Sequence, residues 1–260
     1  MNEVPSRVRR HDLERVTLFP TCLVTLVFPT AAESARRILE RAGLTVEIAE
    51  GAACCGQPAW NSGHVKEARR VAVGALEALA DGGDVILCSG SCTTMLAHSW
   101  PELFEGTEKA QVAKDVASRA HEFSSFLADD VGTERLGPLR MAKPAFVAYH
   151  DSCHMLRGLG IKDAPRRLLG AIEGLEVTDL AAQERCCGFG GTFSIRYPEV
   201  SSAMADEKVD DIVTHGAHEV VASDAGCLMQ ICGRAGARDV SLPGRYIADV
   251  IYGALSDGEV

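Results

Sequence analysis

The pattern of hydrophobic and polar positions alternates between short apolar runs and longer stretches of helical periodicity. The apolar runs RVTLF (15–19), LTVEIA (44–49) and DVILC (84–88) predict buried strands. Between them, the segments at 30–43 and 64–83 place apolar residues at the spacing of an amphipathic helix. Strands that alternate with helices favour right-handed crossover connections and therefore a parallel sheet.

The second half of the chain follows the same order of patterns. AFVAYH (145–150), LEVTDL (175–180) and HEVVAS (218–223) predict three further strands, and the segments at 163–174 and 198–216 predict the helices between them. The chain is therefore expected to be an α/β protein made of two pseudo-repeated, Rossmann-like domains, each with its own parallel sheet.

The ends of the two repeats complete the predicted organisation. We expect one long closing helix over 109–132 in the first repeat and a helix over 244–255 in the second. The segment 132–144 contains Gly and Pro and is predicted to be the linker. The first repeat would then cover 14–131 and the second 145–256.

Cysteine is the residue type that repeats most clearly. Cys-Cys-Gly occurs at 54–56 and again at 186–188. A single cysteine precedes the pair by 32 residues in the first repeat and by 33 in the second, and another follows it by 37 and 40 residues. Two sets of four result, which are Cys22, Cys54, Cys55 and Cys92, and Cys153, Cys186, Cys187 and Cys227. Cys88 and Cys232 have no counterpart and are interpreted as core fillers.

Every cysteine of the two sets follows a predicted strand. The loops past the carboxyl ends of parallel strands are where ligands bind in α/β sheets, so each set is expected to converge in space. Four thiolates suit a soft metal centre. Structural zinc sites usually use C-x2–4-C knuckles, and the C-x3-C spacing at 88–92 has no counterpart at the matching position of the second repeat. The pattern favours an iron–sulfur centre over zinc, which stays an alternative. The glycine after each cysteine pair would let the backbone turn or approach closely.

Charge and the amino-terminal pattern limit partners and location. The net charge is −10 and no Lys/Arg block occurs, which argues against nucleic acid and anionic membranes as partners. The segment 7–32 resembles a charged region before an apolar one, but Asp12 and Glu14 interrupt its basic part and Pro20 its apolar part. We therefore expect no signal peptide, no membrane span and a cytoplasmic location.

Several motifs together resemble one known family. They are FPTCLV, CCGQPAWNSG, SGSCTTM, SCHMLRGLG, CCGFGGTFS, DEKV and GCLMQI, and with their surroundings they cover the chain from about Val16 to Leu255. The chain resembles the lactate utilization protein A family, which belongs to the CCG-motif (cysteine-rich domain) proteins. The cysteine-rich subunit of heterodisulfide reductase and the iron–sulfur subunits of glycolate oxidase and anaerobic glycerol-3-phosphate dehydrogenase are other members.

This resemblance implies an iron–sulfur electron-transfer subunit of a complex that oxidises L-lactate, a small 2-hydroxy acid, to pyruvate. It also implies up to two clusters, most simply [4Fe–4S], ligated by the two cysteine sets named above. The expected partners are a ferredoxin-like iron–sulfur subunit and a third lactate utilization subunit, without which the chain would be inactive. One departure is that the heterodisulfide reductase motif has a fifth cysteine where this chain has Ser89 and Asp224.

The sequence leaves the chemistry of lactate itself open. A base and a carboxylate clamp would be needed, and His154 and Arg157 are the catalytic candidates, with His150 and Arg196 beside them. The alternative is that these are surface-facing loop residues and that a partner carries the chemistry.

Two other functions stay open at this point. One is a thiol–disulfide oxidoreductase subunit like heterodisulfide reductase, and the other is a zinc-stapled, non-enzymatic scaffold. The loop aromatics Trp60, Phe189 and Phe193 would either anchor a partner or pack over the site.

Overall fold

The structure, a computed structural model, describes residues 14–255 and contains two four-stranded parallel sheets. The first has the order β2-β1-β3-β4 and the second the order β6-β5-β7-β8. The strands are β1 (Arg15–Phe19), β2 (Thr45–Ile48), β3 (Asp84–Leu87), β4 (Ala120–Glu122), β5 (Arg140–His150), β6 (Glu173–Thr178), β7 (Val220–Ala222) and β8 (Gly244–Tyr246). The expected fold class, two pseudo-repeated α/β units with parallel sheets, is confirmed.

Helices connect the strands in the same order in both halves. Those of the first half are α1 (Cys22–Val27), α2 (Pro29–Arg41), α3 (Gln57–Asn61), α4 (Val65–Ala78), α5 (Gly90–Thr94), η1 (Met95–Ser99), α6 (Trp100–Leu103), α7 (Ala110–Ser118), α8 (Phe123–Ser125), η2 (Phe126–Val131) and η3 (Thr133–Leu136). Those of the second half are η4 (His154–Leu159), α9 (Asp163–Gly170), α10 (Thr192–Arg196), α11 (Pro198–Thr214), α12 (Ala225–Gly236) and α13 (Ile247–Gly253). Among them η1, η2 and η4 are π-helical and η3 is a 3-10 turn.

The prediction of one long closing helix over 109–132 was wrong. Helix α7 ends at Ser118, and the next residues form β4, which pairs in parallel with β3 before the chain becomes helical again. The reason is that β4 carries polar side chains and lacks an apolar alternation, so its sequence does not look like a strand. His121 of β4 is buried and its Nε2 lies 2.9 Å from Asp84 Oδ1, which satisfies the polar side chain at the sheet edge.

The carboxyl-terminal helix predicted over 244–255 was too long by five residues. Gly244–Tyr246 forms β8, which pairs with β7, and only Ile247–Gly253 is helical. Strand β5 likewise begins at Arg140, inside the segment expected as a linker, and its register shifts before Ala145. The division of the chain at 132–144 stays a prediction. The charged segment 7–13 and residue 256 lie outside the described residues.

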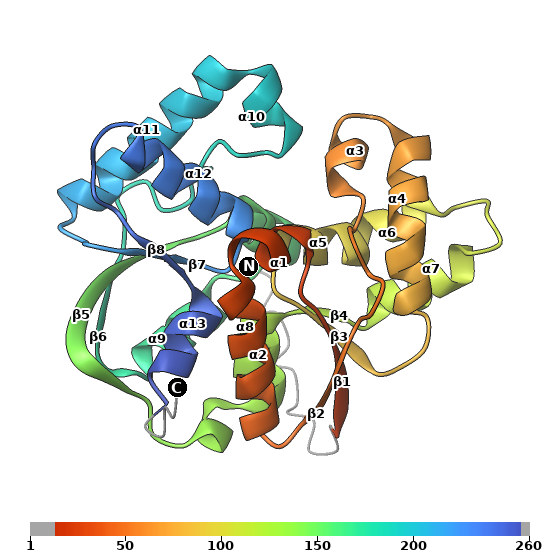
Figure 1. Cartoon of the computed structure of the whole chain (residues 1–260), viewed down its shortest axis with the longest axis horizontal. Coiled ribbons are helices and arrows are strands. Elements are labelled where there is room, and N and C mark those ends of the chain that lie inside the picture. The colour runs from red at the N-terminus through yellow and green to blue at the C-terminus, as the bar shows by residue number, and fades with distance from the viewer. Residues whose placement is uncertain (1–13, 256–260) are drawn as a thin grey trace, which may run out of the picture.

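The two halves share one hydrophobic core. Figure 1 shows α2, α8, α9 and α13 between the two sheets. Helix α13 of the second half packs against α2 of the first, and Ser34 Oγ donates to Asp249 Oδ1 at 2.7 Å across this contact. A single cluster of buried apolar residues runs from β1 through these helices to β5 and β7. The shared helices therefore set how the two sheets face each other.

The outer faces of the sheets are covered separately. Helices α4, α6 and α7 pack on the first sheet in a second apolar cluster that belongs to the first half alone, while α11 and α12 lie over the second sheet. Within residues 14–255, none of the helices combines the length and the apolar composition that a membrane crossing requires.

Candidate metal centre

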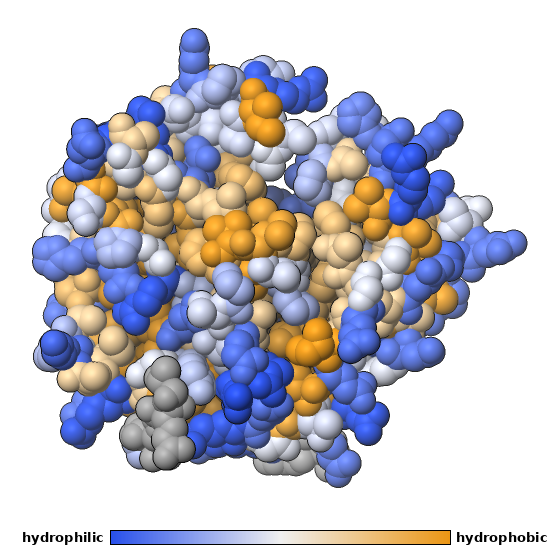
Figure 2. Space-filling model, viewed as in Figure 1, coloured by the Kyte–Doolittle hydropathy of each residue, from blue (hydrophilic) through white to orange (hydrophobic). Residues whose placement is uncertain are grey.

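All eight cysteines of the two repeated sets line one cavity of about 370 Å³. They come from loops and helix starts that follow β1, β2 and β3 in the first half and β5, β6 and β7 in the second. Figure 2 shows this face hollowed between the regions of α3 and α10, both of which contribute to the lining. The carboxyl edges of the two sheets thus bring the two sets to a common space.

The first quartet (Cys22, Cys54, Cys55 and Cys92) is compact. Cys55 Sγ lies 3.3 Å from Cys92 Sγ, and Cys54 Sγ accepts a hydrogen bond from the Gly56 N–H at 3.5 Å. Cys92 is held at the start of α5, where the Ser89 hydroxyl oxygen accepts from its N–H at 3.3 Å.

The second quartet (Cys153, Cys186, Cys187 and Cys227) repeats this arrangement. Cys186 Sγ lies 3.9 Å from Cys153 Sγ and accepts from the Gly188 N–H at 3.4 Å. Cys227 lies in the first turn of α12, where the Asp224 carboxylate caps the helix by accepting from the Gly226 N–H.

The glycine that follows each vicinal pair has a steric reason. Gly56 has φ +86° and Gly188 has φ +85°, a region that residues with a side chain rarely adopt. A Cβ atom would lie 2.7 Å from the Ala68 carbonyl oxygen in the first case and 2.6 Å from the Ser201 carbonyl oxygen in the second. Both expected roles of the glycine, the turn and the close approach, are confirmed.

Crowding of the thiols changes their pKa values in the same way in both quartets. Hydrogen bonds from Cys22 and Cys55 hold the pKa of Cys54 well below its usual range. The pKa of Cys55 is raised because it donates to Cys54 and is buried. Cys186 and Cys187 repeat the pattern. Without a cation each quartet therefore favours a thiolate beside protonated thiols, whereas a metal would stabilise several thiolates together.

The positions of the missing fifth cysteines join the two halves. Asp224 Oδ2 accepts from the Ser91 N–H at 2.9 Å and from the Ser89 hydroxyl at 3.2 Å, and the Gly90 N–H donates to the Ser223 carbonyl at 3.3 Å. Ser89 and Asp224 are thus helix caps that link the loops after β3 and β7. Cys88 and Cys232 do not line the cavity.

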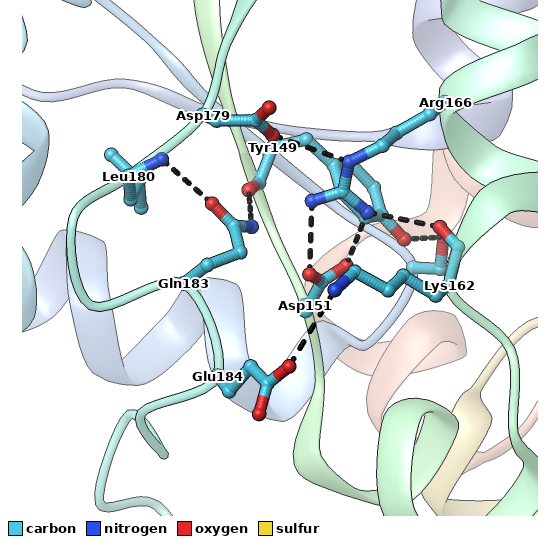
Figure 3. Close-up of polar contacts among 9 residues, drawn as sticks. Tyr149, Asp151, Lys162, Arg166, Asp179, Leu180, Gln183 and Glu184 are labelled. Carbon is cyan, nitrogen blue, oxygen red and sulfur yellow. Dashed lines mark hydrogen bonds and ion pairs between the residues drawn. The ribbon is translucent and has the colours of Figure 1, made fainter. Parts of the chain in front are cut away.

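A polar network holds the second cysteine loops together, as Figure 3 shows. Asp151, two residues before Cys153, accepts two hydrogen bonds from Arg166, each 2.9 Å long. Gln183, three residues before Cys186, donates to the Tyr149 carbonyl at 2.8 Å and accepts from the Leu180 N–H at 2.7 Å. The loop after β5 is therefore tied to the loop after β6, which positions Cys153 against Cys186.

Of the two catalytic candidates, only His154 lines the cavity. Its Nε2 lies 3.4 Å from Gln57 Nε2 and its Nδ1 lies 3.7 Å from Cys153 Sγ. Arg157 donates to the Glu184 carbonyl at 2.8 Å and borders a separate surface hollow, and Arg196 is exposed outside the cysteine cavity. The expected pair of base and clamp is therefore not brought together, because the π-helical turns of η4 carry Arg157 away from the rim.

Other residues line the cavity or lie beside it without a recognisable motif. Gln57 donates to the Ser91 carbonyl at 2.8 Å, and Ser62 Oγ lies 2.7 Å from Thr192 Oγ1, which joins the two halves. The aromatics Trp60, Phe189 and Phe193 are half-buried, whereas Ile195 beside the cavity is 79% exposed. Single polar residues in loops carry no sequence signal for such contacts.

His150 ends β5 and is fully buried. One of its ring nitrogens and the Sγ atoms of Cys187 and Cys227 are three potential ligand atoms that all lie within 4.8 Å of one another. Burial lowers the pKa of His150 to about 3, so the ring is neutral at neutral pH.

Comparisons with known proteins agree with the repeat. The family model described as CCG, cysteine-rich domain, matches residues 16–97 and 147–232. Lactate utilization protein A of Bacillus subtilis (strain 168) is 40% identical over 91% of this chain and 98% of its own length, and that of Bacillus cereus (strain B4264) has the same values.

A solved structure shares the fold. A hypothetical protein from Helicobacter pylori superposes with a TM-score of 0.65 at 11% identity, over 95% of this chain and 50% of the other, so the chain spans half of that protein. From the repeated cysteine loops, the two family-model matches and the 40% identity, the chain belongs to the lactate utilization protein A family of CCG cysteine-rich domain proteins.

Proposed function

We propose that this chain is the iron–sulfur electron-transfer subunit of a complex that oxidises L-lactate to pyruvate. The observation that carries the proposal is the gathering of two cysteine quartets on one cavity of about 370 Å³ in a chain 40% identical to proteins named for lactate utilization. The supporting chemistry is the donor set, because four sulfur ligands suit iron–sulfur centres.

The residues would divide the work as follows. Cys22, Cys54, Cys55 and Cys92 would hold one centre, and Cys153, Cys186, Cys187 and Cys227 the other. Bound there, [4Fe–4S] clusters would supply one-electron acceptors, and two of them would together hold the two electrons that lactate loses on becoming pyruvate.

The surrounding residues would give each quartet its setting. The N–H groups of Gly56 and Gly188 already donate to one sulfur in each quartet, and such hydrogen bonds stabilise added negative charge. Buried Cys55, Cys92, Cys187 and Cys227 lie away from solvent, while Cys22, Cys54, Cys153 and Cys186 are only half-buried and border the open side.

Lactate oxidation also releases two protons, from the hydroxyl group and the carbon that bears it. His154 is the imidazole that borders the cavity and is the candidate to hold one of them. No arginine borders the cavity among residues 14–255, so a clamp for the substrate carboxylate is expected on a partner. We therefore propose that the chain acts with a ferredoxin-like iron–sulfur subunit and a third lactate utilization subunit.

Anaerobic reconstitution tests this function. The full chain, loaded with iron and sulfide, is mixed with lactate and an artificial electron acceptor, first alone and then with both partner subunits. Acceptor reduction is expected only in the complete mixture. Turnover by the chain alone would contradict the partner requirement. A complete mixture that holds iron but does not respond to lactate would contradict the proposed reaction, and if it reduces a disulfide the heterodisulfide reductase alternative is supported instead.

A further inference from the structure

His150 is a buried side chain whose polar atoms lack partners. Its exposed fraction is 0%, and neither Nδ1 nor Nε2 has a hydrogen-bond partner among residues 14–255. Buried polar side chains in folded proteins are nearly always paired, because an unpaired one has given up its hydrogen bonds to water without a replacement. A buried imidazole without hydrogen-bond partners indicates that a further group, a hydrogen-bonding group or a metal, completes the site at the ring.

The geometry identifies where that missing partner would lie. A ring nitrogen of His150 lies within 4.8 Å of both Cys187 Sγ and Cys227 Sγ, and those two sulfurs lie within 4.8 Å of each other. Donor atoms on one tetrahedral metal are about 3.5 Å apart, given metal–sulfur and metal–nitrogen bonds of about 2.3 and 2.0 Å. A small contraction would therefore bring the ring to bonding distance of a metal atom held by Cys187 or Cys227.

The matching position of the first half has no imidazole. His150 is the last residue of β5 and lies in register with Ala222 of β7. The last residue of β1 is Phe19, which lies in register with Leu87 of β3 and is also fully buried. The two sites thus have corresponding cysteines but differ at this position. The first has a phenyl ring, which cannot bind a metal, and the second has an imidazole, which can.

We propose that His150 is a nitrogen ligand of the metal centre held by the second quartet. The identity of that centre as an iron–sulfur cluster rests on the proposed function, but the placement of the ring against Cys187 and Cys227 does not. Histidine ligation raises the reduction potential of an iron–sulfur centre relative to ligation by cysteine alone. The second centre would then accept electrons from the first, which gives the chain a direction of transfer.

The experiment compares the full chain with three variants after anaerobic loading with iron and sulfide and chemical reduction. Pulsed electron paramagnetic resonance on ¹⁵N-histidine-labelled protein reports nitrogen bound to a paramagnetic centre. Coupling is expected in the unchanged chain, is lost in His150→Phe, which copies the first half, and is retained in His154→Gln, the matched control for the other nearby imidazole. The midpoint potential of one centre is expected to become more negative in His150→Phe.

A further variant guards against a folding defect. His150→Cys keeps a metal donor and is expected to retain the metal of the second quartet without the nitrogen coupling. No coupling in the unchanged chain, coupling that survives in His150→Phe, or coupling that disappears only in His154→Gln would each overturn the proposal.

One outcome separates this inference from the proposed function. If the second quartet takes zinc, electron transfer fails at that site, and X-ray absorption at the zinc edge replaces the resonance measurement. A nitrogen neighbour of zinc that disappears in His150→Phe would uphold the ligand, whereas an all-sulfur shell would overturn it.

Discussion

The two cysteine quartets have the same sulfur framework in different surroundings. Their cysteines, helix starts and glycine turns correspond one to one, down to similar N–H donors and nearly equal φ angles. The strand before the first quartet, β1, ends in the apolar residues Leu18 and Phe19. The strand before the second, β5, ends in the polar residues Tyr149 and His150.

A buried lysine adds to the difference. Lys208 of α11 is fully buried, donates to the Ala182 carbonyl at 2.6 Å and acts electrostatically on Cys187 and His150. The Ser201 carbonyl faces Gly188 as the Ala68 carbonyl faces Gly56, so these two residues align α11 with α4. In this alignment the residue of α4 that matches Lys208 is the buried Ala75. The comparison teaches that a repeat can keep its ligands while each copy acquires its own electrostatic environment, and two sites of different potential can follow.

The largest expected effect tests whether the quartets are separate sites. Cys55→Ser and Cys187→Ser should each lose the metal of its own quartet and keep the other, because a hydroxyl replaces a thiolate ligand at a buried position. Cys232→Ser, outside the cavity, should keep both. Iron and sulfide analysis of anaerobically prepared protein measures this. Equal iron in all three variants would show that the quartets are not the binding sites.

The polar surroundings of the second quartet should matter for stability. Arg166→Met leaves the Asp151 carboxylate buried without its two hydrogen bonds, and we expect a loss of about 3 kcal/mol in the free energy of unfolding. Urea unfolding of the metal-free chain measures the loss. The control is Arg36→Ala on the exposed face of α2, where ion pairs with Glu33 and Glu40 should contribute less than about 1 kcal/mol. Equal losses would mean that the network in Figure 3 does not stabilise the second loops.

The edge strands extend the comparison, because Glu122 ends β4 where Tyr246 ends β8. Burial raises the pKa of Glu122 from 4.5 to about 7. The unfolded chain loses this proton at lower pH than the folded chain does, so stability should fall as pH rises from about 4.5 to 7 and level off above it. This fall in the free energy of unfolding should be on the order of 3 kcal/mol.

Glu122→Gln should remove this pH dependence, because an amide does not titrate in this range. The amide oxygen can still accept from Ser124 and Ser125, so the local structure is kept. Tyr246→Phe is the control and should leave the slope between pH 4.5 and 7 as it is. The measurement is urea unfolding of the metal-free chain across this range. A slope that persists in Glu122→Gln would assign it to other groups.

The smallest expected effect concerns the mouth of the cavity, where the halves touch. Ser62 and Thr192 should be coupled by about 0.5–1 kcal/mol through their 2.7 Å hydrogen bond. A double-mutant cycle with Ser62→Ala and Thr192→Val measures the coupling in the free energy of unfolding. Coupling near zero would indicate that the halves are not in contact at this point in solution.

The sequence by itself determined the repeat, the fold class and the order of cysteine loops. The apolar runs at 15–19, 84–88 and 145–150 are long enough to identify buried central strands. Once strands and helices alternate, right-handed crossovers place the strand ends of each half on one edge. The need for glycine after each vicinal pair was also visible, since Gly56 and Gly188 meet the same local steric limit.

Only the tertiary structure decided how the two halves meet. The facing of the quartets depends on α2 packing against α13, which are more than 200 residues apart in sequence and have no local signal for one another. Strand β4 was missed because its polar His121 is satisfied by Asp84, a partner from another strand. The position of His150 against Cys187 and Cys227 likewise depends on three loops arriving at one point. Local patterns encode periodicity and strain, whereas contacts between distant segments arise only when the whole core has packed.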